Sequence, residues 1–124
     1  MSDAREPSSS ESLLTLRDAL RCFAADRDWD PFHSPKNLAT ALSVEVAELL
    51  EPFQWLTDEQ SRRLTPEQHA AVREEIADVL LYLIRLADKL DVDLIAAAKA
   101  KIVRNAAKYP IDKNRGSSKK YSEL

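Results

Sequence analysis

The 124-residue sequence predicts an all-α protein, a bundle of four helices. Apolar residues recur at three- and four-residue spacings along four segments, which is the periodicity of amphipathic helices. No stretch shows the sustained period-two alternation of a half-buried strand. The segments are also bounded by capping residues and prolines, as helix termini usually are.

The first two predicted helices flank an aromatic loop. The first helix starts at Ser12 and ends before Trp29-Asp30-Pro31, because the residue before a proline disfavours the helical region. Ser34-Pro35 then supplies an N-cap and a proline at the first helical position, which opens the second helix. Pro52 should kink or stop this helix, because it removes the hydrogen bond to the Glu48 carbonyl.

The remaining helices follow a connector over residues 56–64, which has room for one helical turn. Thr65-Pro66-Glu67-Gln68 combines an N-cap, a proline and a capping-box glutamine, and predicts a helix to about Leu90. Asp91 is expected to cap the fourth helix, which ends at Tyr109-Pro110. The predicted organisation is a disordered leader (1–11), a helical domain (12–110) and a basic tail (111–124).

Composition restricts the classes of function. The single glycine excludes a glycine-rich phosphate loop, which needs several glycines for its turns. One cysteine and no 18-residue apolar run predict a cytoplasmic protein without a membrane span. The net charge of −3 disfavours nucleic acid as a partner. Residues 99–120 nevertheless hold eight basic residues and one acid, which suits either a phosphate-bearing ligand or a solubilising tail.

Two pairs of acids provide candidate metal ligands. Glu45 and Glu48 share one face of the second helix, and Glu75 and Asp78 share one face of the third. At about 100° per residue, Glu45 lies within its helix's apolar stripe, where an ionised carboxylate is costly unless it is paired or binds metal. An oxygen-rich site between the helices would suit Mg²⁺ or Mn²⁺. The alternative is that these are ordinary surface acids. A di-iron site is disfavoured because neither histidine follows a glutamate by three.

Aromatic and basic residues provide candidate substrate contacts. Trp29 and His33 precede the second helix, Trp55 follows it, and Tyr82 shares a face with Glu75 and Asp78. Such aromatics could stack a base, although core tryptophans and a turn histidine explain them equally. Lys101, Asn105 and Lys108 share one face of the fourth helix, where lysines also complement the helix dipole.

Together these residues resemble the all-α nucleoside triphosphate pyrophosphohydrolases, the MazG-like superfamily, and within it the dCTP pyrophosphatase branch. The likeness spans roughly residues 13–124. Its motifs are Arg27-Asp28-Trp29-Asp30-Pro31-Phe32-His33-Ser34-Pro35-Lys36-Asn37-Leu38, Glu45-x-x-Glu48, Phe53-Gln54-Trp55, Glu75-x-x-Asp78-x-x-x-Tyr82, Lys101-x-x-x-Asn105-x-x-Lys108-Tyr109-Pro110 and Ser118-Lys119-Lys120-Tyr121.

The resemblance implies a Mg²⁺-dependent enzyme that cleaves a nucleoside triphosphate, dCTP or a base-modified analogue, into monophosphate and pyrophosphate. It implies metal ligation by the four acids, with Glu45 or Glu48 activating water. The implied substrate contacts are Trp29, His33, Trp55, Tyr82, Lys101, Asn105, Lys108 and the tail 115–120. It also implies a homo-oligomer, a tetramer or dimer, which fits the broad apolar arc of the third helix.

Two positions depart from the family pattern and leave the base preference open. Pro52 replaces a helix-tolerant residue and could displace Trp55, and Leu20 stands where some animal members carry a substrate-contacting histidine. The same chemistry on dUTP or oxidised purine triphosphates is therefore one alternative. The other is a non-catalytic helical oligomer that binds a partner.

Overall fold

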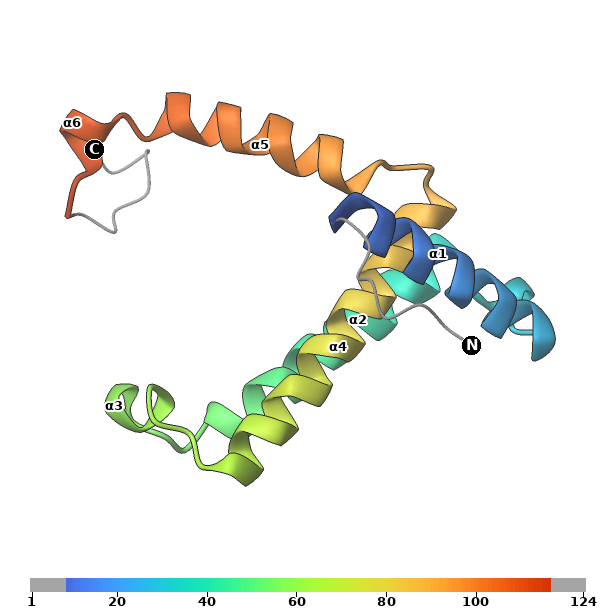
Figure 1. Cartoon of the computed structure of the whole chain (residues 1–124), viewed down its shortest axis with the longest axis horizontal. Helices are drawn as coiled ribbons and strands as arrows, with labels where there is room; N and C mark the ends of the chain where they lie inside the picture. Colours follow the sequence, from blue (N-terminus) through green and yellow to red (C-terminus); the bar gives the residue numbers. More distant parts are fainter. Residues whose placement is uncertain (1–8, 117–124) are drawn as a thin grey trace. The chain divides into compact units, whose positions relative to one another are not determined.

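The computed structural model describes residues 9–116, and all the regular secondary structure in that range is helical. Four long helices and several short turns follow one another along the chain (Figure 1). In order they are α1 (Ser9–Asp26), the 3₁₀ turn η1 (Asp30–Phe32), α2 (Pro35–Leu50), the 3₁₀ turn η2 (Glu51–Phe53), α3 (Asp58–Ser61), α4 (Pro66–Lys89), α5 (Leu94–Lys108) and α6 (Ile111–Asn114). The predicted all-α class is confirmed.

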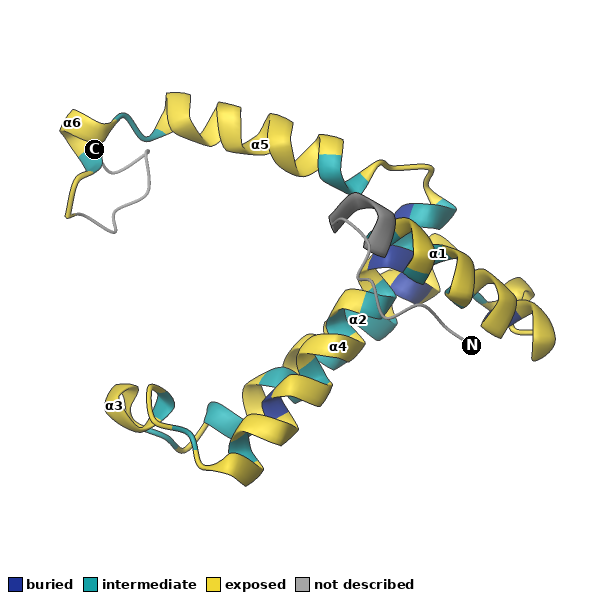
Figure 2. Cartoon of the chain, in the orientation of Figure 1, coloured by how far each residue is buried: buried dark blue, intermediate teal, exposed yellow. Residues whose placement is uncertain are grey.

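The chain divides into two compact units between Val92 and Asp93. In the first unit α2 and α4 run side by side in opposite directions, and α1 packs on α4 (Figure 1). The buried apolar side chains lie on these three helices (Figure 2). They are Ala24, Leu38, Val72, Ile84 and Ala87. The second unit contains α5 and α6.

Local capping fixes the helix starts as the sequence predicts. The Ser34 hydroxyl accepts a hydrogen bond from the Asn37 backbone N–H at 3.1 Å, so α2 begins at Pro35. Thr65 and Gln68 form the reciprocal capping box that opens α4. A second capping box opens the short helix α3 in the connector, where one helical turn was expected. These bonds join residues three apart, which is why sequence spacing alone reveals them.

Pro52 ends α2 as predicted. The α-helix stops at Leu50, and the chain tightens into the 3₁₀ turn η2, whose first residue donates its N–H to the Glu48 carbonyl. Proline cannot donate an N–H to the ladder, so the α-helix cannot continue past this point. The stop lies only two residues beyond Glu48, and the carboxylates therefore sit in the last turns of α2.

Two helix boundaries differ from the prediction. Helix α1 begins at Ser9, three residues before the predicted Ser12, and residues 1–8 lie outside the described range. The prediction that Asp91 caps the fourth helix is wrong, because Asp93 accepts the capping bond from Ala96. Asp91 instead adopts the left-handed conformation (φ 54°) that terminates α4. None of the helices described between residues 9 and 116 is long and apolar enough to cross a membrane.

Candidate functional site

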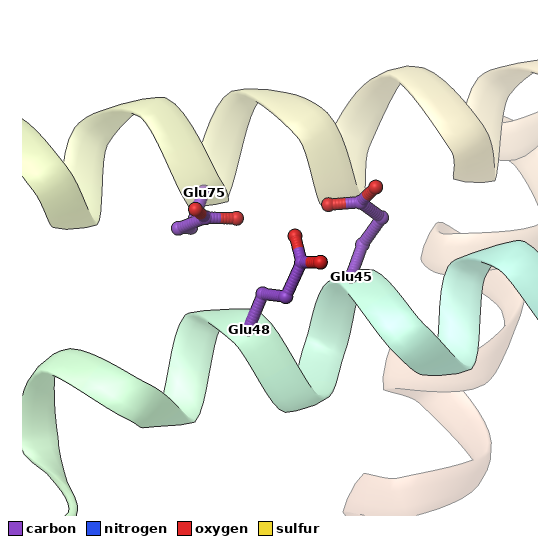
Figure 3. Close-up of side chains that lie close together, drawn as sticks. All are labelled: Glu45, Glu48 and Glu75. Atoms are coloured by element: carbon purple, nitrogen blue, oxygen red, sulfur yellow. The ribbon is translucent and has the colours of Figure 1, made fainter.

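Three glutamates converge between α2 and α4. Glu45 and Glu48 extend from α2 toward α4, and Glu75 extends from α4 toward them (Figure 3). One carboxylate oxygen from each residue lies within 4.8 Å of the others. The antiparallel packing of the two helices produces this arrangement, because it brings the end of α2 beside the first half of α4. We call these three residues the acidic cluster.

The acidic cluster is electrostatically unfavourable in the protein alone. Burial, followed by the hydrogen bond and negative charge of Glu48, raises the pKa of Glu45 above its ordinary value. Burial and the charges of Glu48 and Asp78 likewise raise the pKa of Glu75. Each of these two glutamates also has one buried oxygen, Oε2, without a hydrogen-bond partner. The cluster therefore offers more carboxylate oxygens than it has hydrogen-bond donors to pair with them.

These features fit a divalent cation. Carboxylate oxygens are the donors that Mg²⁺ and Mn²⁺ prefer, and the cluster offers no sulfur or imidazole ligand. None of the ion pairs found among residues 9–116 neutralises the three glutamates. A bound cation would compensate the repulsion and satisfy the unpaired oxygens. The structure thus supports a site for a divalent metal between α2 and α4.

Asp78 occupies a position between this cluster and a neighbouring pocket. Its side chain is exposed, and its oxygens are not among the three that lie within 4.8 Å. Its charge nevertheless contributes to the raised pKa of both Glu45 and Glu75. Glu51, which the sequence analysis did not select, also contributes to the raised pKa of Glu75. The structure brings three of the four predicted ligands together and places the fourth beside them.

A pocket of about 140 Å³ opens between α1, the η1 loop and α4. We call it the aromatic pocket. It contains three of the predicted substrate contacts, Trp29, His33 and Tyr82, together with Asp78. Its other lining residues are Leu20, Phe23, Ala24, Leu81 and Arg85. Leu20, at a position flagged in the sequence, therefore forms part of its wall.

The end of α1 directs Trp29 into this pocket. Asp28 adopts a left-handed conformation (φ 53°), and the backbone N–H of Trp29 reaches back to the Ala24 carbonyl at 2.9 Å. This is the pattern of a Schellman termination, in which the residue after the left-handed one packs against the preceding helix. Trp29 accordingly contacts Phe23 edge to face, with ring centroids 5.6 Å apart. The indole remains 45% exposed, so one part of it is available to a ligand.

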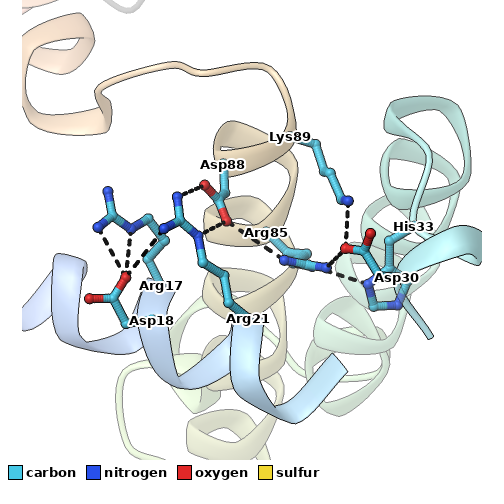
Figure 4. A network of polar contacts seen from close by, with 8 residues as sticks. All are labelled: Arg17, Asp18, Arg21, Asp30, His33, Arg85, Asp88 and Lys89. Atoms are coloured by element: carbon cyan, nitrogen blue, oxygen red, sulfur yellow. Dashed lines mark hydrogen bonds and ion pairs between the residues drawn. The ribbon is translucent and has the colours of Figure 1, made fainter. Parts of the chain in front are cut away.

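A network of opposite charges supports the rim of the aromatic pocket (Figure 4). Arg85 of α4 is buried, and it donates from Nη2 to Asp30 Oδ1 at 2.6 Å and from Nε to His33 Nδ1 at 3.1 Å. Lys89 also donates to Asp30 at 2.6 Å. On the α1 side, Arg21 donates from Nε to Asp88 Oδ2 at 2.8 Å. We call these residues the ion-pair network.

The ion-pair network lowers the pKa of its carboxyl groups, whereas the acidic cluster raises the pKa of Glu45 and Glu75. The hydrogen bonds from Lys89 and Arg85 lower the pKa of Asp30 below its ordinary value. The hydrogen bond from Arg21 lowers the pKa of Asp88. These carboxylates are therefore charged and compensated within the chain.

Four further predicted substrate contacts remain, one in the first unit and three in the second. Trp55 follows η2 and is 86% exposed, and it does not line the aromatic pocket of its own chain. Lys101, Asn105 and Lys108 are exposed on α5, in the second unit. Part of the predicted basic tail, Lys119 and Lys120, lies outside the described residues. Their roles remain predictions.

A family model described as the MazG-like family matches residues 40–124, which include the whole acidic cluster. The chain belongs to the MazG-like family.

Similar named proteins match a longer part of the chain than the family model does, toward the N-terminus. The chain is 47% identical to a human protein named dCTP pyrophosphatase 1, over 89% of this chain and 68% of that protein. It is 44% identical to the bovine protein of the same name, over 98% and 75%. A solved structure titled as a pyrophosphatase from Archaeoglobus fulgidus is 42% identical, with a TM-score of 0.75 over 88% of this chain and 99% of that one.

Sequence reasoning missed the ion-pair network of this MazG-like chain. Arg85 and Asp88 stand three apart on α4, and this spacing alone would suggest an ordinary surface pair. Their main partners, Asp30 and Arg21, are 55 and 67 residues away. The one available signal was a charged residue, Arg85, within the otherwise apolar stretch 79–87 of α4.

Proposed function

We propose that the protein hydrolyses nucleoside triphosphates to the monophosphate and pyrophosphate, with dCTP or a base-modified dCTP as the preferred substrate and Mg²⁺ as the metal. The observation that carries the proposal is the acidic cluster, whose unpaired oxygens lie beside an aromatic pocket of the same unit. Asp78 belongs to the pocket lining and influences the cluster, and so connects the two. The substrate preference follows the relatives named dCTP pyrophosphatase 1.

Each group of residues has a distinct task in this proposal. Glu45, Glu48, Glu75 and Asp78 hold the metal, which supplies charge compensation for the phosphate oxygens and for the leaving pyrophosphate. Glu45 or Glu48 orients the attacking water and accepts its proton.

Substrate recognition divides between base and phosphates. Trp29 and Tyr82 contact the base and sugar through their aromatic faces, and His33 contributes a polar group beside them. Lys101, Asn105 and Lys108 of α5, with the basic tail, neutralise the phosphates. Trp55 completes the base pocket of a neighbouring copy in this proposal, which is supported by its absence from the lining of the aromatic pocket of its own chain.

The proposal includes a homo-oligomer, a tetramer or a dimer. Several large apolar side chains of the first unit remain exposed on α2 and α4. They are more numerous than the single, scattered apolar residues that are normal on a protein surface. They include Val44, Val46, Leu50, Ile76, Leu80 and Leu83. A second copy of the chain would cover them. We expect this assembly in the cytoplasm, where the single free cysteine, Cys22, is stable in reduced form.

The deciding experiment is phosphorus NMR of the products formed from dCTP with and without Mg²⁺. We expect dCMP and pyrophosphate, and no turnover after chelation. Inorganic phosphate and a diphosphate as first products would contradict the proposed bond cleavage. The same assay over dUTP, oxidised purine triphosphates and 5-modified dCTP establishes the preferred base.

A binding-only protein is distinguished by adding a non-hydrolysable dCTP analogue in a thermal-shift assay. We expect the analogue to raise Tm in a Mg²⁺-dependent manner, and hydrolysis to accompany binding in the dCTP assay. Stabilisation by the analogue without any hydrolysis of dCTP would instead support the non-catalytic alternative.

A further inference from the structure

The contact between Arg85 and His33 determines which hydrogen-bonding group the aromatic pocket presents. The Arg85 guanidinium can only donate, so its Nε–H at 3.1 Å requires an unprotonated His33 Nδ1. A neutral imidazole has one protonated nitrogen, and the proton must then reside on Nε2. The ring can therefore offer a ligand a donor, and no acceptor, at its remaining nitrogen.

We propose that Arg85 is a positioning residue that holds His33 as the neutral Nε2–H tautomer, so that His33 donates a hydrogen bond to an acceptor atom of the nucleoside bound in the aromatic pocket. A carbonyl oxygen or an unprotonated ring nitrogen of the base, or a sugar oxygen, provides such an acceptor. The identity of the ligand rests on the proposed function, whereas the state of His33 does not.

The guanidinium is fixed by two carboxylates besides His33. Asp30 accepts from Nη2 at 2.6 Å, and Asp88 lies 3.6 Å from Nη1. Arg85 is 5% exposed, so the side chain has little freedom to leave His33. A planar donor fork held on several sides imposes direction as well as charge on the imidazole.

The charged surroundings of His33 favour the neutral ring. Partial burial and the positive charges of Arg85 and Lys89 on α4 lower the pKa of His33, while Asp30 in η1 opposes them. Asp78 and Tyr82 line the same pocket from α4, and the lining residues from α1 are apolar. An imidazole held in this way keeps one hydrogen-bonding character through neutral pH, unlike an ordinary histidine.

The network also makes a clean test feasible. If Arg85 is replaced, Asp30 retains Lys89 and Asp88 retains Arg21, so neither carboxylate loses its last cation. Arg85→Met keeps much of the apolar stem and removes the donors. Arg21→Met makes the same chemical change at the other end of the network and leaves the His33 contact intact, so it is the matched control.

The primary measurement is long-range ¹H–¹⁵N NMR of the imidazoles in the full chain without nucleotide. The chain has two histidines, and exposed His69 serves as the internal reference. We expect His33 to show a single Nε2–H tautomer and a pKa below the ordinary histidine value of 6.5. In Arg85→Met the His33 pKa should move up toward that ordinary value, and in Arg21→Met it should not. A protonated Nδ1 in the wild type, or identical behaviour in both variants, overturns the proposal.

The kinetic measurement tests the role in binding. For the wild type we expect any change of KM for dCTP that is caused by His33 protonation to occur at a lower pH than an ordinary histidine, with a pKa of 6.5, would give. Loss of one positioned hydrogen bond in Arg85→Met should raise KM about two- to tenfold, with kcat nearly unchanged. This rise in KM should be accompanied by a new pH dependence of KM near the pH at which His33 titrates. Arg85→Lys should bring KM part of the way back to the wild-type value.

The two measurements separate the possible failures. The expected NMR result with no hydrolysis of any triphosphate refutes the proposed function and leaves the state of His33 established. Hydrolysis of dCTP with an unchanged KM in Arg85→Met refutes the donor role of His33 and leaves the function intact. Equal losses of Tm and kcat in Arg85→Met and Arg21→Met, without a specific effect on His33, would make Arg85 merely structural.

Discussion

Helix α4 carries two charged regions that solve opposite electrostatic problems. Near its first half Glu75 faces Glu45 and Glu48, and the charges are all negative. Near its end Arg85 and Asp88 meet partners of opposite sign from α1 and η1. The pKa values of Glu45 and Glu75 are raised, whereas those of Asp30 and Asp88 are lowered.

The comparison shows in which region the carboxylate charges are compensated by other groups of the same chain. The carboxylates of the ion-pair network have their cations in the folded protein, so this region contributes to the scaffold that orients the pocket. Among residues 9–116 the acidic cluster has buried oxygens without hydrogen-bond partners, and a bound cation would compensate its charge. A purely structural cluster would avoid repulsion between carboxylates. Such repulsion is expected where a bound cation completes the site.

The largest expected effect is the loss of turnover on neutralising the acidic cluster. Glu45→Gln preserves the shape of the side chain and removes one ligand charge. Since mutations around metal ligands alone cost about 10- to 100-fold, we expect kcat to fall by at least about 100-fold. Steady-state kinetics at saturating Mg²⁺ measures this, and Glu74→Gln, an exposed acid next to Glu75 on α4, is the control.

The same variant sharpens the comparison through its stability. Removing one of several like charges relieves repulsion, so the metal-free Glu45→Gln protein should have a Tm equal to or above that of the wild type. Clear destabilisation without metal would mean that Glu45 has a structural partner, and the cluster would then resemble the ion-pair network.

The next effect concerns the aromatic pocket between the two regions. Trp29→Ala should raise KM for dCTP by about five- to 150-fold, because stacking on an aromatic face contributes about 1–3 kcal/mol per base. Its indole is 45% exposed, so the loss of stability should remain below that of a core tryptophan. A large drop in Tm with unchanged KM would assign Trp29 to the core.

Trp55→Ala extends this test to the assembly. The side chain is 86% exposed and lies outside the pocket of its own chain. An increase in KM, smaller than that of Trp29→Ala, is therefore expected only if another copy completes the pocket. Light scattering at micromolar concentration should then show a dimer or tetramer, and a stable monomer would exclude this role.

A smaller effect is expected in the ion-pair network itself. Asp88→Asn removes the charged acceptor of Arg21 and should lower the free energy of unfolding at pH 7 by about 1–3 kcal/mol. The pKa of Asp88 is lowered in the folded state, so this stabilisation is present above its ordinary pKa of 3.8 and disappears as the pH falls through the lowered value. Urea titrations of both proteins at pH 7 and near pH 3 measure it, and an equal difference at both pH values would contradict it.

The smallest effect is the opposite pH dependence of the acidic cluster. Because the pKa of Glu45 is raised in the folded state, its protonated form favours folding. Its contribution is most favourable below the ordinary value of 4.5 and declines as the pH rises through the raised value. Metal-free Glu45→Gln should therefore lose less stability than the wild type on going from pH 4.5 to 7, and Mg²⁺ should reduce this difference. Parallel curves would show that Glu45 is not perturbed.

The sequence by itself determined the features whose causes are local. Helix periodicity and capping boxes join residues three or four apart, so the bounds of α2 and α4 and the stop at Pro52 were predictable. The facing direction of Glu45 followed from the apolar stripe of its own helix, and the glutamates of the acidic cluster were predicted correctly as neighbours. The family motifs added the chemistry that a spacing of acids cannot specify.

Only the tertiary structure decided most of the rest, because it depends on contacts between segments that are far apart in the sequence. One difference was local, because the N-cap of α5 is Asp93 instead of Asp91, which takes the left-handed conformation that ends α4. Asp78 is exposed and lines the aromatic pocket, whereas Trp55 is not among its lining residues. Arg85 meets His33 across 52 residues of sequence, and this contact assigns the imidazole its proton, because packing of η1 against α4 brings a permanent donor to Nδ1.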